Sequence, residues 1–185
     1  MNNYFNSLSG WFLRQNSLSL FILFCLAGLQ LNVPSSTGSI NIFAVIELIG
    51  ILSVISWIYS VGIKSRQLLI KNGADLKGEG IFNLIFGIAI IATVFMHYLA
   101  KEQILLDKNF ETLNYKLVYI QPWPLAMVKF LSIGLLAVQS AKHLVSAELR
   151  RNALLKEYLG TLSGFIFSWI GVWYIQPRIK KIMEI

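Results

Sequence analysis

The feature that most constrains this chain is an apolar run of helix length, from Ile40 to Ile63, that contains one acid, Glu47. At 1.5 Å per residue, a helix of this length crosses the roughly 30 Å hydrocarbon core of a bilayer. A predicted basic loop follows the run, with Lys64, Arg66, Lys71 and Lys77. Because basic loops stay on the cytoplasmic side of a membrane, this segment predicts both a transmembrane helix and its orientation.

Composition places the whole chain in the membrane class. Hydrophobic residues make up 56% of the 185 residues, the mean hydropathy is +0.63, and only 14% of residues are charged. The net charge of +7 comes from short clusters between apolar runs, which argues against a nucleic-acid surface. The single cysteine, Cys25, excludes a disulfide within the chain. Residues 1–185 are therefore predicted to form a single membrane-embedded helical domain.

The predicted fold is all-α: a polytopic membrane helix bundle with four transmembrane helices and a fifth hydrophobic helix at the C-terminus. The four predicted spans are Ser17 to Val33, Ile40 to Ile63, Ile81 to Ala100, and a helix that starts near Leu125. The short uncharged turn from Pro34 to Gly38 predicts that the first two helices form an antiparallel hairpin.

Two connecting segments have their own predicted character. Lys101 to Pro124 is predicted to be an ordered interfacial loop, because it contains Tyr and Trp residues and two prolines. The helix that starts near Leu125 is predicted to continue without a break to Tyr158, and its second half, Gln139 to Tyr158, is predicted to leave the bilayer as an amphipathic helix at the membrane surface.

The charges predict an orientation and leave one conflict. Arg14, the 64–77 cluster and the 142–156 cluster fall on one side, with Lys101, Lys108 and Lys116 opposite, so the N-terminus is predicted to be cytoplasmic. If the last apolar run, from Leu159 to Ile175, crosses the membrane, the three cations that follow it are left outside. A re-entrant helix would keep those cations, Arg178, Lys180 and Lys181, inside.

A stripe of small residues favours the crossing helix over the re-entrant one. The stripe consists of Gly160, Gly164, Ser168 and Gly171. Small residues at this spacing let membrane helices approach closely, so the stripe is predicted to pack against another helix.

The stretch from Ala141 to Ile179 carries a resemblance to known proteins. Its residues include Ser146-Ala147-Glu148-Leu149 and Trp173-Tyr174-Ile175-Gln176-Pro177-Arg178. In this fifth of the chain it resembles the C-terminal part of uncharacterised bacterial multi-pass membrane proteins. The resemblance implies a bacterial inner-membrane location and no functional residues.

Ionisable residues within the apolar runs are the candidates for chemistry, since placing a charge in hydrocarbon costs at least about 2.5 kcal/mol. Glu47, His97 and Lys129 all lie toward the outer ends of their predicted helices. They form a candidate intramembrane cluster for protons or ions. Alternatively, Lys129 extends to the headgroups, His97 lies in the interface, and Glu47 is hydrogen-bonded locally.

A second candidate site is basic. Lys142, Arg150, Arg151 and Lys156 are predicted to contact anionic lipid headgroups, with an ordinary solvated helix face as the alternative. A haem held by two histidines is disfavoured, because His97 and His143 are predicted at opposite membrane depths. The sequence contains no metal-binding, nucleophile or phosphate-loop motif, so no metal or cofactor is predicted.

The leading functional hypothesis is a non-enzymatic integral membrane protein that acts as a subunit or scaffold of a membrane complex, or as an oligomeric pore. Its partners would be membrane lipids and either copies of itself or other membrane subunits, with no nucleic acid. A small transporter or ion channel that uses Glu47 is the first alternative. A lipid-acting membrane enzyme is the second.

Overall fold

A computed structural model gives the fold of the chain. It describes residues 10–25, 42–74, 79–110 and 123–183, with the backbone alone at 42–44, 79 and 98–110. The predicted turn at 34–38 and the end of the predicted first span lie outside these residues. Lys77 and Lys116 also lie outside them.

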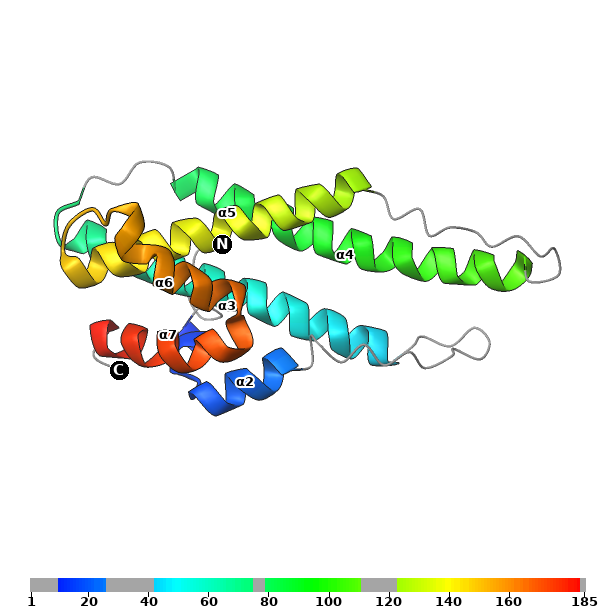
Figure 1. The fold of residues 1–185 in the computed structure, drawn as a ribbon, viewed down its shortest axis with the longest axis horizontal. Helices are drawn as coiled ribbons and strands as arrows, with labels where there is room; N and C mark the ends of the chain where they lie inside the picture. The colour runs from blue at the N-terminus through cyan, green and yellow to red at the C-terminus, as the bar shows by residue number, and fades with distance from the viewer. Residues whose placement is uncertain (1–9, 26–41, 75–78, 111–122, 184–185) are drawn as a thin grey trace.

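All regular structure in the described residues is helical (Figure 1). A helical turn at 10–14 comes first. The helices that follow are α2 (Ser17–Cys25), α3 (Ile42–Lys71), α4 (Glu79–Phe110), α5 (Trp123–Leu149), α6 (Leu155–Ile166) and α7 (Ser168–Met183). The prediction of an all-α bundle is confirmed at this level.

Three helices of the described part are long and apolar enough to cross a bilayer. They contain the segments Val45–Lys71, Gly80–His97 and Trp123–Leu149. This is the architecture of a membrane protein. The finer prediction of four or five spans is not confirmed, because α2 has nine described residues and the last apolar run is divided between α6 and α7.

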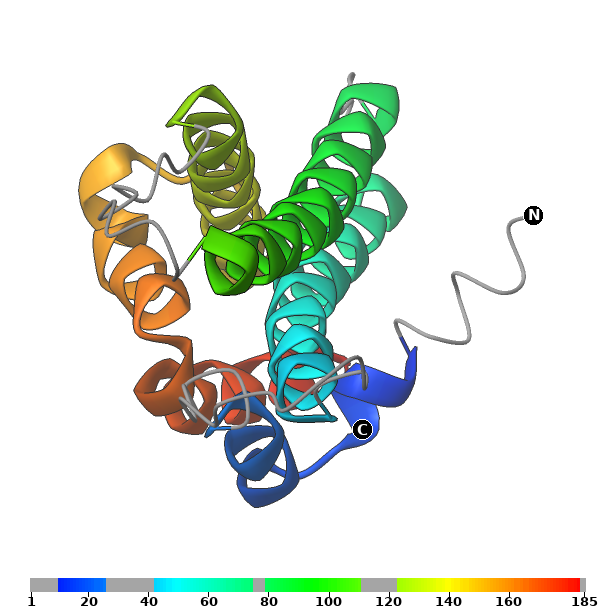
Figure 2. The same ribbon diagram turned by 90° about the vertical axis from the view of Figure 1, so that its right-hand side faces the viewer.

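Helix α3 is the centre of the bundle. In the most apolar 18-residue stretch of α3, 56% is buried inside the protein; in the corresponding stretches of α4 and α5, 22% and 33% are buried. Tyr59 of α3 stacks on Phe86 of α4, with 4.0 Å between ring centroids, and its hydroxyl makes a 2.9 Å hydrogen bond with Asn83. On the α5 side, the Ser140 hydroxyl donates to the Ile58 carbonyl oxygen at 2.9 Å. Figure 2 shows α4 and α5 diverging on one side of α3, with α2 and α7 on the other.

Gly62 marks the point where the three long helices converge. A Cβ atom added there would lie 2.6 Å from Phe82 Cζ of α4 and still closer to the Ser140 hydroxyl of α5. Only a residue without a side chain leaves room here for the side chains of Phe82 and Ser140.

The long helices extend beyond their predicted ends. Lys64 and Arg66, predicted to lie in a loop, belong to α3, and Arg66 is only 4% exposed. Similarly, Lys101 to Phe110 continue α4, although an interfacial loop is predicted there. The physical reason is shared: both segments are rich in helix-forming residues and contain no proline or glycine.

In contrast, the predicted continuous helix to Tyr158 is interrupted. Helix α5 ends at Leu149, and Arg150 has a left-handed backbone with φ of 53°. Residues 150–154 then form a loop that leads into α6. No glycine or proline occurs in this loop, so the usual helix-breaking residues do not predict the break.

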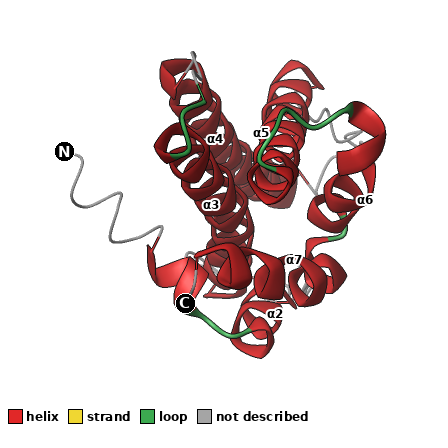
Figure 3. Ribbon diagram, turned by 90° about the vertical axis from the view of Figure 1, so that its left-hand side faces the viewer, coloured by secondary structure: helices red, strands yellow, loops and turns green. Residues whose placement is uncertain are grey.

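The last apolar run is folded back on itself, which corrects the favoured prediction of one crossing helix. Helix α6 ends at Ile166, Phe167 adopts a non-helical conformation (φ −98°, ψ 55°), and α7 begins at Ser168. Helix α7 continues beyond the end of the apolar run at Ile175, through Pro177, to Met183. Figure 3 shows α6 beside α5, and α7 close to α2 below it.

The small-residue stripe therefore does not lie along one helix. Gly164 of α6 and Gly171 of α7 face each other across the turn, and a Cβ on Gly171 would lie 2.6 Å from Gly164 Cα. Gly160 has no neighbouring atom within 4 Å of such a Cβ. Gly164 and Gly171, on the two sides of the turn, allow α6 and α7 to pack closely, and Gly160 makes no such contact.

Candidate functional site

The predicted cluster of Glu47, His97 and Lys129 is partly assembled. The half-buried carboxylate of Glu47 on α3 exerts a Coulombic attraction on the half-buried Lys129 ammonium of α5. The two groups are not among the ion pairs within 4.0 Å in the described part of the chain. The Lys129 ammonium instead lies 5.9 Å from the centroid of the Phe130 ring. The pair is thus a longer-range attraction between neighbouring helices.

His97 is half-exposed near the end of the apolar part of α4. For the described residues, the structure records no hydrogen bond or ion pair that joins it to Glu47 or Lys129. His143 lies far from it, because the His143 ring contacts Phe82 (5.8 Å between centroids) at the start of α4. From Phe82 to His97 is about 22 Å along the helix at 1.5 Å per residue. No group of three metal-ligating side chains occurs within the described ranges.

The most completely satisfied polar group in the described core is Gln176 of α7, which sequence reasoning missed. Its side-chain oxygen accepts a hydrogen bond from Trp57 Nε1 of α3 at 2.9 Å. Its nitrogen donates to the carbonyl oxygens of Phe12 (3.2 Å), Leu13 (2.9 Å) and Gln15 (3.0 Å). Because the last carbonyls of a helix have no partner within it, Gln176 caps the helical turn at 10–14.

This junction, which we call the Gln176 node, is enclosed by aromatic side chains. Trp57 and Gln176 are 0% and 1% exposed. The Trp57 ring lies 5.3 Å from that of Phe24 on α2 and 5.4 Å from that of Phe165 on α6, between centroids. The node therefore joins the N-terminal turn, α2, α3, α6 and α7. One signal could have indicated it: Gln176 is the only side-chain amide in the charge-free stretch 159–177.

A second polar junction joins α5, α6 and α7. The Arg178 guanidinium of α7 pairs with the Glu148 carboxylate of α5 through two nitrogens, with Nε at 2.8 Å from Oε1. Its third nitrogen donates to the Thr161 hydroxyl of α6 at 2.8 Å. Burial disfavours the charged guanidinium, but the hydrogen bond and charge of Glu148 outweigh it and raise the pKa of Arg178. The Tyr174 ring, 4.6 Å from the guanidinium carbon, completes the surroundings.

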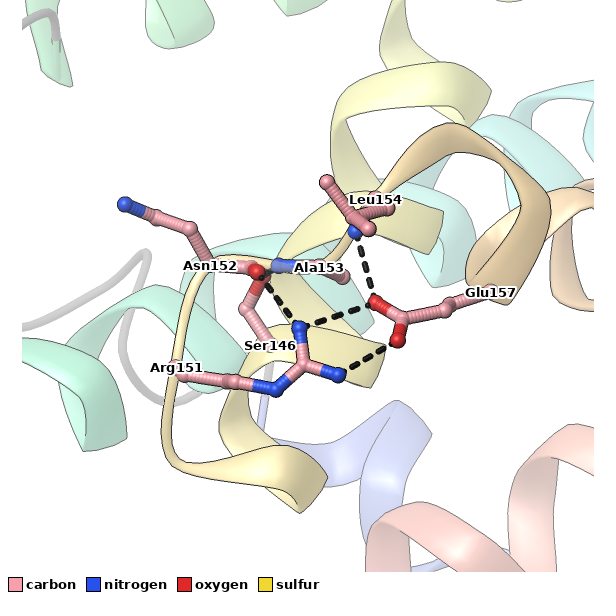
Figure 4. A network of polar contacts seen from close by, with 6 residues as sticks. All are labelled: Ser146, Arg151, Asn152, Ala153, Leu154 and Glu157. Carbon is pink, nitrogen blue, oxygen red and sulfur yellow. Dashed lines mark hydrogen bonds and ion pairs between the residues drawn. The ribbon is translucent and has the colours of Figure 1, made fainter.

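Polar contacts also explain the loop between α5 and α6 (Figure 4). The Arg151 guanidinium pairs with the Glu157 carboxylate, which also accepts a 2.7 Å hydrogen bond from the Leu154 backbone N–H. The Ser146 hydroxyl accepts a hydrogen bond from the Ala153 N–H at 2.9 Å. Hydrogen bonds from Arg151 and then Leu154 lower the pKa of Glu157. An anion at the start of α6 also satisfies the unpaired N–H groups and the dipole there.

The four predicted lipid-headgroup residues gather near the end of the bundle where α5 finishes. Lys142, Arg150, Arg151 and Lys156 are all exposed. Arg151 is already paired with Glu157, so the other three retain their charges for an external anion. Contact with lipid headgroups stays a prediction.

Helices α3 and α5 run in the same direction, which places the charged groups at two ends of the molecule. Three pairs of residues show this, because their numbers increase in the same order along both helices. The charge of Glu47 acts on Lys129, the Ile58 carbonyl oxygen accepts a hydrogen bond from Ser140, and the charge of Arg66 acts on His143. We call the end where α3 and α5 finish the basic end. Glu47 and Lys129 lie toward the opposite end.

Comparison of the chain with protein-family models, curated proteins and solved structures finds no match. The functional argument therefore depends on the geometry above.

Proposed function

We propose that this protein is a non-enzymatic integral membrane protein that acts as a subunit or scaffold, with the outer faces of α4 and α5 as the docking surface for other membrane helices. The observation that carries the proposal is the contrast between its helices. More than half of the apolar stretch of α3 is buried by the rest of the chain, whereas most of the apolar stretches of α4 and α5 is exposed.

The exposed apolar residues of α4 recur at helical spacing and surround a glycine. Gly87 has open space where a Cβ would be, and its neighbours on the same face are large. They are Leu84, Ile88, Ile91 and Phe95, which are 62%, 38%, 70% and 52% exposed. A glycine among large apolar residues lets the backbone of a partner helix come close.

Helix α5 repeats this arrangement. Gly134 is exposed and has open space around it. The residues around it on this face are Met127, Phe130, Leu131 and Leu135, which are 60%, 70%, 62% and 51% exposed. Two such faces, on two neighbouring helices, suit a partner that packs against both.

The proposal includes an orientation in a bacterial inner membrane. The basic end holds the cations of the end of α3, the end of α5 and the loop that follows it. The positive-inside rule favours the cytoplasm for this end. Because the same rule counts Arg14 with these cations, the proposal puts the N-terminus on the cytoplasmic side as well.

Native mass in a mild detergent tests the assembly. The purified protein is expected to exceed the 20.9 kDa of one chain, after subtraction of the detergent, as an oligomer or with co-purified subunits. Gly87→Leu fills the space where a partner helix would approach and should lower the mass toward that of one chain. Light scattering coupled to size exclusion gives the measurement.

Gly160→Leu is the matched control, since Gly160 also has open space around it but lies on α6. This variant should keep the assembled mass. A wild-type protein that is monomeric in several mild detergents, or an equal effect of the two variants, would contradict the proposal.

A second candidate, a small proton or ion transporter, is favoured by the attraction between Glu47 and Lys129 across α3 and α5. An acid and a base in hydrocarbon are costly, and such pairs often mark ion pathways. In proteoliposomes that contain a pH-sensitive dye, wild-type protein should then conduct protons faster than protein-free liposomes. Glu47→Gln, which keeps the shape and removes the charge, should abolish this flux. Equal rates for protein-containing and protein-free liposomes would eliminate the candidate.

A further inference from the structure

The stretch from residue 159 to residue 177 has the composition of a transmembrane helix, but it does not form one continuous helix. It contains no acidic or basic residue. As one straight helix it would reach about 28 Å at 1.5 Å per residue, close to the thickness of the hydrocarbon core. It is instead divided by the turn at Phe167.

Neither half can cross a bilayer alone. Helix α6 has 12 residues and α7 has 16. These correspond to about 18 Å and about 24 Å, against roughly 30 Å of hydrocarbon. A hairpin of this size can reach the middle of a bilayer but not its far side.

The turn of the hairpin is apolar and exposed. Ile166 and Phe167 are 64% and 57% exposed, and Trp169 and Ile170 are 52% and 56% exposed. Within the described part of the chain, each of these side chains is therefore more than half exposed. A cluster of large apolar residues at one tip needs an apolar surrounding.

The two ends of the hairpin carry the charges. Lys156 and Glu157 begin α6, and Lys180 and Lys181 lie in the last turn of α7. Arg178 binds both Glu148 of α5 and Thr161 of α6, so α7 returns toward the end where α5 finishes. The hairpin is thus polar at its open end and apolar at its turn.

Part of the backbone at the turn is hydrogen-bonded, which matters in hydrocarbon because unpaired N–H and C=O groups are costly there. The Phe167 N–H donates to the Ser163 carbonyl oxygen at 2.9 Å. The Phe167 carbonyl oxygen accepts from the N–H groups of Ile170 (2.9 Å) and Gly171 (2.7 Å). The close approach of Gly164 and Gly171 removes space for water between the two helices.

We propose that α6 and α7 form a re-entrant hairpin that occupies one leaflet of the bilayer, with its turn in contact with acyl chains and both ends in the headgroup layer of the basic end. The partner of this surface is the hydrocarbon of that leaflet. The C-terminal cations then lie on the same side of the membrane as Lys142 and Arg150, in agreement with the positive-inside rule. The proposal does not depend on whether α4 and α5 dock other helices.

Cysteine labelling of the full chain tests it. In a Cys25→Ala background, single cysteines replace Asn152 before the hairpin, Lys181 after it, and Phe167 at the turn; all three residues are exposed. A membrane-impermeant maleimide is applied to intact cells and to inverted vesicles of the expression host. Positions 152 and 181 are expected to react in the same preparation, and position 167 in neither until detergent is added.

Two outcomes would overturn the proposal. Reaction of positions 152 and 181 in opposite preparations would show a crossing helix, and reaction of position 167 as fast as position 152 would place the hairpin outside the bilayer. A bimane label at position 167, or at Ile170→Cys, gives a second measurement that is independent of sidedness. Nitroxide on lipid acyl chains is expected to quench it more than aqueous iodide, and the reverse order would also overturn the proposal.

Discussion

Replacement of Gly171 by alanine is expected to destabilise the hairpin more than any other single methyl group added to α6 or α7. The new Cβ would lie 2.6 Å from Gly164 Cα and closer still to the carbonyl group of that residue. These are backbone atoms, which cannot rotate away as a side chain can, so the two helices must separate. Overpacking of this kind costs about 1–3 kcal/mol, and more where the backbone must move.

The other glycines of the stripe supply graded controls for this experiment. A Cβ on Gly164 would lie 3.0 Å from the Ile175 Cδ1 atom, which is the movable end of a side chain, and a Cβ on Gly160 would meet nothing within 4 Å. Gly160→Ala should be neutral or stabilising, because alanine favours a helix by about 1 kcal/mol over glycine. Thermal unfolding in detergent should rank the alanine variants 160, 164, 171 from most to least stable. Equal stability of the 160 and 171 variants would contradict the close contact.

Replacement of Gln176 by leucine is expected to have the second large effect. It leaves the Trp57 Nε1–H and the carbonyl oxygens of Phe12, Leu13 and Gln15 without their hydrogen bonds. Each buried polar group left unpaired costs on the order of 1–3 kcal/mol. The decrease in the free energy of unfolding should be several times larger than that caused by an ordinary surface substitution. The N-terminal turn should also become sensitive to protease.

Two further variants separate the hydrogen bonds from the change in shape. Gln139→Leu makes the same substitution at a half-buried glutamine of α5, for which the described structure records no hydrogen bond, and it should have little effect. Trp57→Phe combined with Gln176→Leu should cost less than the sum of the two single changes, because both remove the same bond. Additive effects in this double-mutant cycle would show that Trp57 and Gln176 are not coupled.

The candidate site could be predicted from the sequence only in part. Glu47 and Lys129 stand out because charged residues are rare in apolar runs, and the structure brings them within reach of each other's charge. Gln176 stands out far less, since an amide near the end of an apolar run resembles an ordinary helix boundary. Its importance comes from Trp57 and the N-terminal turn, which are distant in the sequence.

The sequence by itself determined the all-helical membrane class, the three long helices and the separation of the charged groups to the two ends, because these depend on local hydrophobicity and on the spacing of charges. Only the tertiary structure decided where helices end without glycine or proline. Glu157 and Ser146 supply the hydrogen bonds that replace helix at 150–154, and Gly164 faces Gly171 to close the hairpin at Phe167. The Leu154–Glu157 bond is local to the start of α6, but Ser146 belongs to α5, and Gly164 and Gly171 belong to two helices. The contacts between elements stabilise the chain only after the helices have packed, so hydrophobic periodicity and single helix-breaking residues do not reveal them.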